Sequence, residues 1–329
     1  MSRTMARARW PVRLVWLARS FALTAATATI ASRTVGLPQR GLRMQYSVAL
    51  PPSPSARPQR PPLVFVHGTF HSSWCWAEHW LGFFAQRGHE AYAISLRGTS
   101  GSPEPTPRRI SVDEHVDDLA AFLTAVVGRP AVLVGHSFGG AYVQKLLERG
   151  EPAAAGAVLL CSVPPSGNGA MIWRFLRRSP LSALRITRGF ALKSACTSVD
   201  DASRLFFSAA LPPDEVRRHM TRFAEDSACS LDVPDFNRKL PSRGARADER
   251  PAWVRACPPM LVLGAERDAV VDAEAIEEAA AFYGASSAML PGLGHDVMLV
   301  PGWERAADAI SDWLASPALA ATVSGGKAA

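Results

Sequence analysis

The chain has 329 residues, of which 48% are apolar, enough for a sizeable buried core in one large α/β domain with additions. Its formal net charge of +7 is concentrated at the amino end, because residues 1–60 hold ten arginines and no acidic residue. Residues 61–329 then carry 26 basic and 29 acidic side chains, so the composition excludes a basic nucleic-acid-binding domain.

The amino-terminal segment has the composition of an organelle transit peptide: it is rich in arginine, alanine, serine and threonine, with no acid before Glu78. We expect residues 1–40 to be a transit peptide or disordered, with the chloroplast as the favoured destination and the mitochondrion as the alternative. A secretory signal is a further alternative. Arg19 interrupts the apolar run, so a transmembrane anchor is not expected.

Residues 41–62 are predicted to hold a first strand, within Arg40–Leu50, and a stiff connector that contains six prolines. From Leu63 onward, short apolar runs alternate with helical periods, which is typical of a parallel sheet covered by helices. The predicted strands are Leu63–His67, Ala91–Leu96, Ala131–Gly135, Gly156–Cys161, Met260–Gly264 and Ser286–Leu290. The predicted helices are Trp74–Arg87, Val112–Val127, Phe138–Arg149, Ala273–Tyr283 and Trp303–Leu314.

The alternation breaks between residues 163 and 250, where short helical segments are separated by proline, glycine and serine. We predict a helical cap there, inserted after the sixth strand. Residues 63–162 and 251–316 then form the core, and residues 317–329 form a disordered tail.

The strongest local motif is Gly135-His136-Ser137-Phe138-Gly139, which lies between a predicted strand and a predicted helix. A tight strand-to-helix turn crowds the backbone, and glycine relieves this crowding. Such a turn directs the serine hydroxyl toward the carboxyl ends of the strands, beside free N–H groups at the helix start. The motif therefore predicts Ser137 as a nucleophile.

A serine nucleophile needs a base, and only two histidines follow it in the chain. His219 lies among arginines on a predicted helix of the cap, where we expect a solvated surface side chain. His295 follows the last predicted strand in a glycine-rich loop, and is predicted to be the base. The acid that orients it is predicted to be Asp268, after strand Met260–Gly264, in preference to Glu266, Asp272 and Asp296.

Acyl transfer also needs two N–H donors for the oxyanion. The residue after the nucleophile, Phe138, is predicted to supply one, and Thr69, in the loop after strand Leu63–His67, the other. Gly68 allows this loop to approach closely. His67 is expected to hold the loop in place, and His71 to line the site or to support it.

These motifs together resemble the α/β-hydrolase superfamily over about residues 60–315, with the order Ser, Asp, His. They are H-G-x-x-x-x-x-W at His67–Trp74, R-G-x-x-G-S at Arg97–Ser102, G-H-S-x-G at Gly135–Gly139, and G-H-D at Gly294–Asp296. The stretch from His67 is similar to plant methylesterases and hydroxynitrile lyases, and more closely to plastid-targeted plant hydrolases. Gly68 stands where the lyases carry threonine, which favours an esterase. The resemblance implies an α/β-hydrolase fold without a cofactor.

Neither a metal site nor a disulfide framework is expected. His67 and His71 are four residues apart but lie on a loop without an H-E-x-x-H helix. Five cysteines form an odd set with no C-x-x-C pair, so buried free thiols are predicted.

The cap segment Met171–Lys193 carries six basic residues among apolar ones and no acid. Helices packed on the core with solvated arginines are expected, and peripheral contact with an anionic membrane is the alternative.

The predicted function is serine-dependent hydrolysis of a lipophilic carboxylic ester through an acyl-enzyme. A lyase using the same triad and a ligand-binding receptor on a hydrolase scaffold are the alternatives. The oligomeric state is left open.

Overall fold

A computed structural model describes residues 28–52, 60–243 and 250–320. These residues form one eight-stranded sheet in the order β1-β2-β4-β3-β6-β7-β9-β10. Its strands are β1 (Ile30–Leu37), β2 (Leu42–Ala49), β3 (Leu63–Val66), β4 (Ala91–Ile94), β6 (Ala131–His136), β7 (Ala154–Leu160), β9 (Met260–Ala265) and β10 (Ser286–Leu290). The pairings of β1 with β2 and of β2 with β4 are antiparallel, and the others are parallel.

Helices cover both faces of the sheet, as the buried apolar strands require. One layer holds α1 (Trp74–Ala77), α2 (Trp80–Gln86) and α12 (Glu304–Leu314). The other holds α3 (Val112–Phe122), which continues as a π-helical turn (Leu123–Val127), and α4 (Phe138–Arg149). The remaining core helices are α10 (Ala252–Arg255) and α11 (Ala273–Tyr283). Ser111 and Glu114 form a capping box that starts α3.

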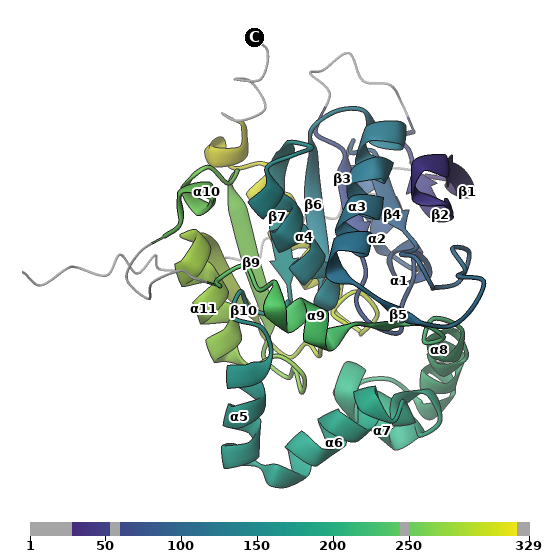
Figure 1. The fold of residues 1–329 in the computed structure, drawn as a ribbon, viewed down its shortest axis with the longest axis vertical. Helices are drawn as coiled ribbons and strands as arrows, with labels where there is room; N and C mark the ends of the chain where they lie inside the picture. Colours follow the sequence, from purple (N-terminus) through teal and green to yellow (C-terminus); the bar gives the residue numbers. More distant parts are fainter. Residues whose placement is uncertain (1–27, 53–59, 244–249, 321–329) are drawn as a thin grey trace, which may run out of the picture.

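A helical cap lies between β7 and β9 in the chain, and β7 is the sixth strand of the main sheet in chain order, as predicted. The cap contains α5 (Gly169–Arg178), α6 (Pro180–Ala191), α7 (Val199–Phe206), α8 (Pro213–Glu225) and α9 (Val233–Arg238). Its short strand β8 (Ser230–Leu231) pairs with β5 (Arg109–Ile110) of the core. In Figure 1, α5, α6, α7 and α8 form a layer below the lower end of the sheet.

The prediction that residues 1–40 are a transit peptide or disordered is wrong for the end of that segment. Residues 30–37 form the edge strand β1, so the predicted first strand is the second. The strand closes a hairpin through a turn in which Gly41 adopts a φ of 57°. The predicted transit peptide otherwise lies outside the described residues, as does most of the proline-rich connector.

The predicted disordered tail also begins too early. Residues 317–320 form a helical turn, and Leu319 is buried against the sheet beside Gly156. The rest of the tail lies outside the described residues. Across the described ranges, none of the helices is long and apolar enough to cross a bilayer. The five cysteines are free thiols, but only Cys75 and Cys161 are buried as predicted, and the other three are partly exposed.

Candidate active site

The turn between β6 and α4 holds Ser137 in a strained backbone conformation, with a φ of 53° and a ψ of −123°. The first turn of α4 is pressed against the end of β3. A Cβ on Gly139 would lie 2.3 Å from the carbonyl oxygen of Val66, so only glycine fits there. The turn is therefore the sharp strand-to-helix bend that the sequence predicted, and its geometry presents the serine at the carboxyl edge of the sheet.

His295 and Asp268 meet as predicted, although they lie 27 residues apart in the chain. The imidazole Nδ1 lies 2.8 Å from Asp268 Oδ2, and both side chains are almost fully buried. The other carboxylate oxygen accepts hydrogen bonds from the amides of Val270 and Val271, at 2.7 and 2.9 Å. Burial lowers the pKa of His295, but the attraction of Asp268 and its hydrogen bond outweigh burial and raise the pKa overall.

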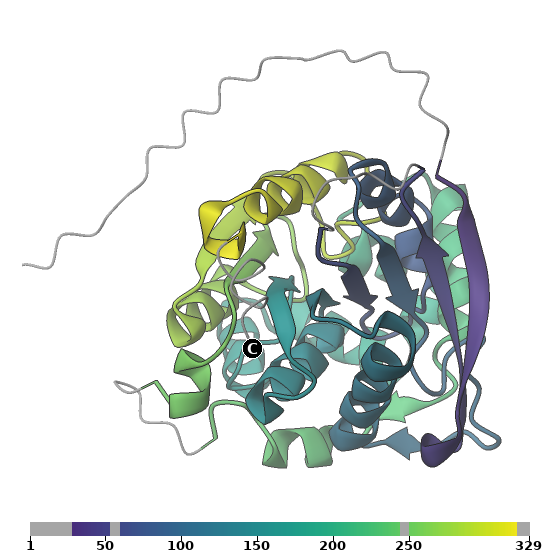
Figure 2. The same ribbon diagram turned by 90° about the horizontal axis from the view of Figure 1, so that it is seen from above.

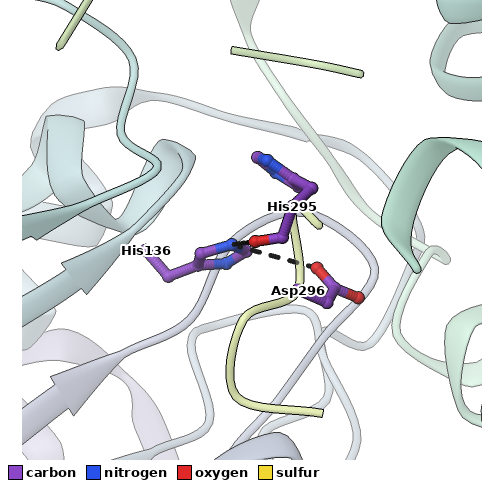
Figure 3. Close-up of side chains that lie close together, drawn as sticks. All are labelled: His136, His295 and Asp296. Carbon is purple, nitrogen blue, oxygen red and sulfur yellow. Dashed lines mark hydrogen bonds and ion pairs between the residues drawn. The ribbon is translucent and has the colours of Figure 1, made fainter. Parts of the chain in front are cut away.

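The serine lies next to His136, and the ring of that residue is 4.7 Å from the ring of His295, centroid to centroid. His136 Nε2 donates to the carbonyl oxygen of His295 at 3.0 Å (Figure 3). The structure thus places the two loops side by side. No hydrogen bond joins Ser137 Oγ to His295 among the described contacts, and such bonds are often long in free enzymes.

The two predicted oxyanion donors lie on adjacent segments. A Cβ on Gly68 would come within 2.8 Å of the Ser137 Cβ, so the loop after β3 passes directly over the nucleophile. Within the described residues, no acceptor binds the amide N–H of Thr69 or of Phe138. His67 holds this loop, as expected: its Nε2 accepts the amide of Leu96 at 2.9 Å, and its Nδ1 donates to Gly68 O at 2.8 Å.

A second buried histidine–carboxylate pair was not predicted. His71 Nε2 lies 3.0 Å from Asp296 Oδ2, and His71 Nδ1 lies 2.8 Å from the carbonyl oxygen of Thr69. Both partners are acceptors, so the ring carries two protons. Burial lowers the pKa of His71, but Asp296 outweighs it and raises the pKa overall; burial raises the pKa of Asp296, but His71 lowers it overall. The G-H-D triplet was the only sequence signal for this contact.

The expectation of a solvated His219 is wrong, because its side chain is only 3% exposed. Its ring stacks on Trp74 at 5.5 Å, with 19° between the planes. Helix α8 turns this face toward the core while its arginines face outward. Burial lowers the pKa of His219 to about 4, so it is a neutral packing residue. Asp272, one of the acids not chosen as the partner of His295, caps α11 by accepting a hydrogen bond from the amide of Ala275.

A cavity of about 250 Å³ opens between Ser137 and the cap. Its walls are mostly apolar and come from α5, α6, the loop after β9 and the start of α9. The lining includes Phe138, Met171, Phe175, Ile186, Phe190 and Val271. This arrangement suits an acyl chain or another apolar group held beside the serine hydroxyl.

Two buried groups have the donor atoms of a metal site, and both contain His295. One adds His136 and Asp296, and the other adds Cys161 and Asp268. Some of their atoms already have hydrogen-bond partners, since Asp268 Oδ2 binds His295 and Asp296 Oδ2 binds His71, whereas Asp296 Oδ1 and His136 Nδ1 are buried without a partner among the described residues. In Figure 3 the imidazole of His295 and the carboxylate of Asp296 point in different directions. Within the part of the chain that the structure describes, both groups therefore belong to the hydrogen-bonded surroundings of His295.

A family model described as "Alpha/beta hydrolase family" matches residues 63–313. Among curated proteins, the chain is 34% identical to "Probable esterase PIR7A" of Oryza sativa subsp. indica over 119 residues, which cover 35% of this chain and 45% of that protein. It is 38% identical to "Non-heme chloroperoxidase" of Streptomyces lividans over 105 residues, which cover 32% and 37% respectively. The chain thus matches less than half the length of these relatives.

The fold is similar to that of a thermophilic esterase from Thermogutta terrifontis, with a TM-score of 0.60 and 20% sequence identity. The superposed region covers 87% of this chain and 98% of that structure. The similarity confirms the predicted fold class, including the mostly parallel sheet with helices on both faces.

Proposed function

This chain belongs to the alpha/beta hydrolase family, and we propose that it hydrolyses carboxylic esters through an acyl-enzyme formed on Ser137. The observation that carries the proposal is the buried pair of His295 and Asp268, joined at 2.8 Å beside the strained serine turn. A buried imidazole with its Nδ1 bound to a carboxylate presents its Nε2 as a proton acceptor.

In the proposed reaction Ser137 Oγ attacks the ester carbonyl carbon while His295 Nε2 takes the hydroxyl proton. The amides of Thr69 and Phe138 donate hydrogen bonds to the tetrahedral oxyanion. The intermediate collapses as His295 returns the proton to the departing alcohol, which leaves the acyl group on the serine. A water molecule then attacks that acyl group while His295 takes a proton from the water. The bond between the acyl carbon and Ser137 Oγ breaks as His295 returns this proton to Oγ, which releases a carboxylic acid and restores the free serine.

The proposed substrate is a lipophilic ester. The apolar cavity beside Ser137 supports this choice, because its walls offer few polar partners. The esterase relative supports ester chemistry over the matched segment, whereas the chloroperoxidase relative carries a different printed activity. A panel of esters with graded acyl length is therefore the direct measurement of substrate class.

Fluorophosphonate labelling tests the nucleophile. We expect the wild type to be labelled at Ser137, and Ser137→Ala and His295→Ala to lose labelling and ester turnover. Ser47→Ala, a buried serine on β2 outside the site, should retain both. A labelled protein that turns over no ester would favour the lyase or the receptor, and an unlabelled wild type would remove Ser137 as the nucleophile.

We also propose import into an organelle, with the chloroplast favoured over the mitochondrion. The arginine-rich, acid-free composition before Ala28 supports the proposal. Because β1 belongs to the fold, the import signal is assigned to the residues that precede it. A fluorescent protein fused after residues 1–29 should enter plastids in plant cells, and diffuse fluorescence would contradict the proposal.

A further inference from the structure

The outer side of the α5–α6 hairpin carries most of the exposed large hydrophobic side chains. Of ten such side chains among the described residues, six lie on α5 and α6 or at the end of α6. They are Ile172, Trp173, Leu176, Leu181, Leu184 and Leu192, with exposed fractions between 44% and 74%. Apolar side chains gathered in this way mark an interaction site rather than ordinary surface.

The same two helices also line the cavity beside Ser137. Met171 and Phe175 of α5 and Ile186 and Phe190 of α6 face the cavity. Ile172 is both exposed and part of the cavity lining, so the apolar outer face meets the cavity wall at this residue. An apolar ligand bound at the outer face of α5–α6 would therefore lie close to the cavity beside Ser137, where the acyl chain is proposed to bind.

The hairpin also carries a surplus of positive charge. Residues 169–193 contain five arginines and one lysine and no acidic residue. Three carboxylates of the surrounding structure contact these cations: Asp201, Asp272 and Glu274. A surplus of three positive charges remains, which favours an anionic surface and opposes contact with a second copy of the same face.

We propose that the outer face of α5–α6 docks on the surface of an anionic lipid bilayer. Trp173, Leu181, Leu184 and Leu192 enter the interfacial region, and the surrounding arginines face the lipid headgroups. The docking itself rests on the hairpin alone. Delivery of acyl chains from the bilayer into the cavity rests in addition on the proposed function.

Quenching of tryptophan fluorescence by brominated phosphatidylcholine tests the docking at one residue. The full-length Ser137→Ala protein is mixed with vesicles of phosphatidylcholine and phosphatidylglycerol, so that no turnover occurs. We expect stronger quenching than in the same protein carrying Trp173→Phe, and the difference isolates Trp173 from the other tryptophans. Equal quenching in the two proteins would overturn the proposal.

Vesicle co-sedimentation tests the hairpin as a whole. A triple variant with Leu181, Leu184 and Leu192 changed to serine should bind these vesicles at least about tenfold more weakly. The matched control changes three hydrophobic side chains that are exposed outside the hairpin, Ile30, Leu50 and Met289, to serine. This control should bind the vesicles as the wild type does. Wild-type binding by the hairpin triple, or a wild-type dimer that this triple disperses, would overturn the proposal.

The two proposals fail in different ways. None of the three leucines lines the cavity, so the hairpin triple should hydrolyse a water-soluble ester at the wild-type rate. Turnover of that ester without docking would remove the membrane proposal alone. Docking by the Ser137→Ala protein without turnover by the wild type would remove the esterase proposal alone.

Discussion

The environment of His295 favours the charged imidazolium, although its proposed first task requires the neutral ring. The Asp268 carboxylate lies 2.8 Å from Nδ1, and in the proposed reaction it stabilises the ring after the ring has accepted the serine proton. The same attraction raises the pKa of His295 above its ordinary value of 6.5, despite burial. The neutral base is therefore the minor form at acidic pH, and its fraction grows as the pH rises.

We predict that kcat/KM on a water-soluble ester increases with pH through an apparent pKa above 6.5. Asp268→Asn removes the main charge that opposes the effect of burial on His295, so the apparent pKa should fall, although Asp296 still raises it. Its kcat should drop by about a thousandfold or more, because the ring loses the partner that fixes its tautomer. The pH profile of each protein is the measurement, with a folded state confirmed by circular dichroism; coincident profiles would contradict this role.

The three residues of the proposed triad were predictable because the fold class determines where they lie. Ser137, Asp268 and His295 each follow a recognisable strand, and parallel strands bring their carboxyl ends to one edge. Structure was needed for the pair of His71 and Asp296, which are separated by 225 residues. A pattern of residue types does not show which buried carboxylate faces which histidine.

The pair of His71 and Asp296 joins two structural elements, the loop after β3 and the loop after β10. The first loop carries the Thr69 amide, and the second carries His295. His71 binds the Thr69 carbonyl oxygen and the Asp296 carboxylate at the same time. One buried imidazolium therefore fixes the proposed oxyanion donor, the Thr69 amide, relative to the proposed base, His295.

Replacing Asp296 by asparagine should destabilise the protein by about 3–5 kcal/mol, because the change leaves a buried charge without its partner. The double variant His71→Gln with Asp296→Asn should recover part of this loss, since neither charge remains. Urea denaturation measures the free energy of unfolding of the single and the double variant. A loss in the single variant that the double variant does not reduce would mean that the charges are not coupled.

The stability difference between the wild type and Asp296→Asn should depend on pH. Since the pKa of His71 is raised in the folded state, its contribution is complete below 6.5 and disappears as the pH rises through the folded pKa. The pKa of Asp296 is lowered, so its contribution is complete above 3.8 and disappears as the pH falls through its folded pKa. The stability difference should be largest between pH 3.8 and pH 6.5. A difference that stays constant across pH would contradict an ion pair between His71 and Asp296.

Most core elements were predictable from periodicity, and the exceptions have local causes. The predicted helix Trp74–Arg87 is interrupted, because His79 leaves the helical region at a φ of −138° and separates α1 from α2. The cap helices were predictable as helices, but not the face that each one buries. His219 lies among arginines in the sequence, yet its ring packs between Trp74 and Phe207.

For the whole molecule, the sheet is closed at one edge by the β1–β2 hairpin rather than by β2 alone, and Figure 2 shows β1 along that edge. The hairpin was missed because β1 has no buried apolar face: most of its side chains are exposed, and only Leu37 is buried. Main-chain pairing with β2 holds it in place. Such a strand cannot be distinguished by composition from the arginine-rich segment before it.

The hairpin is also tied to the core by charge. Arg40, in the turn of the hairpin, donates to the buried carboxylate of Asp118 at 3.0 Å. Its carbonyl oxygen accepts a hydrogen bond from Arg97 at 2.9 Å. Arg97 binds the same carboxylate through two nitrogens, at 2.7 and 2.8 Å. The turn is therefore part of a network that reaches α3.

Two shortened chains would separate the leader from the fold. A chain that begins at Ala28 keeps β1 and should unfold in urea at the midpoint of the full chain. A chain that begins at Gly41 loses Leu37 and Arg40, and should be less stable by about 2 kcal/mol or more, from lost apolar burial together with a weakened network around Asp118. Arg40→Gln in the full chain isolates the charged part of that loss. Equal midpoints for the two shortened chains would mean that the fold begins at β2, as the sequence alone had indicated.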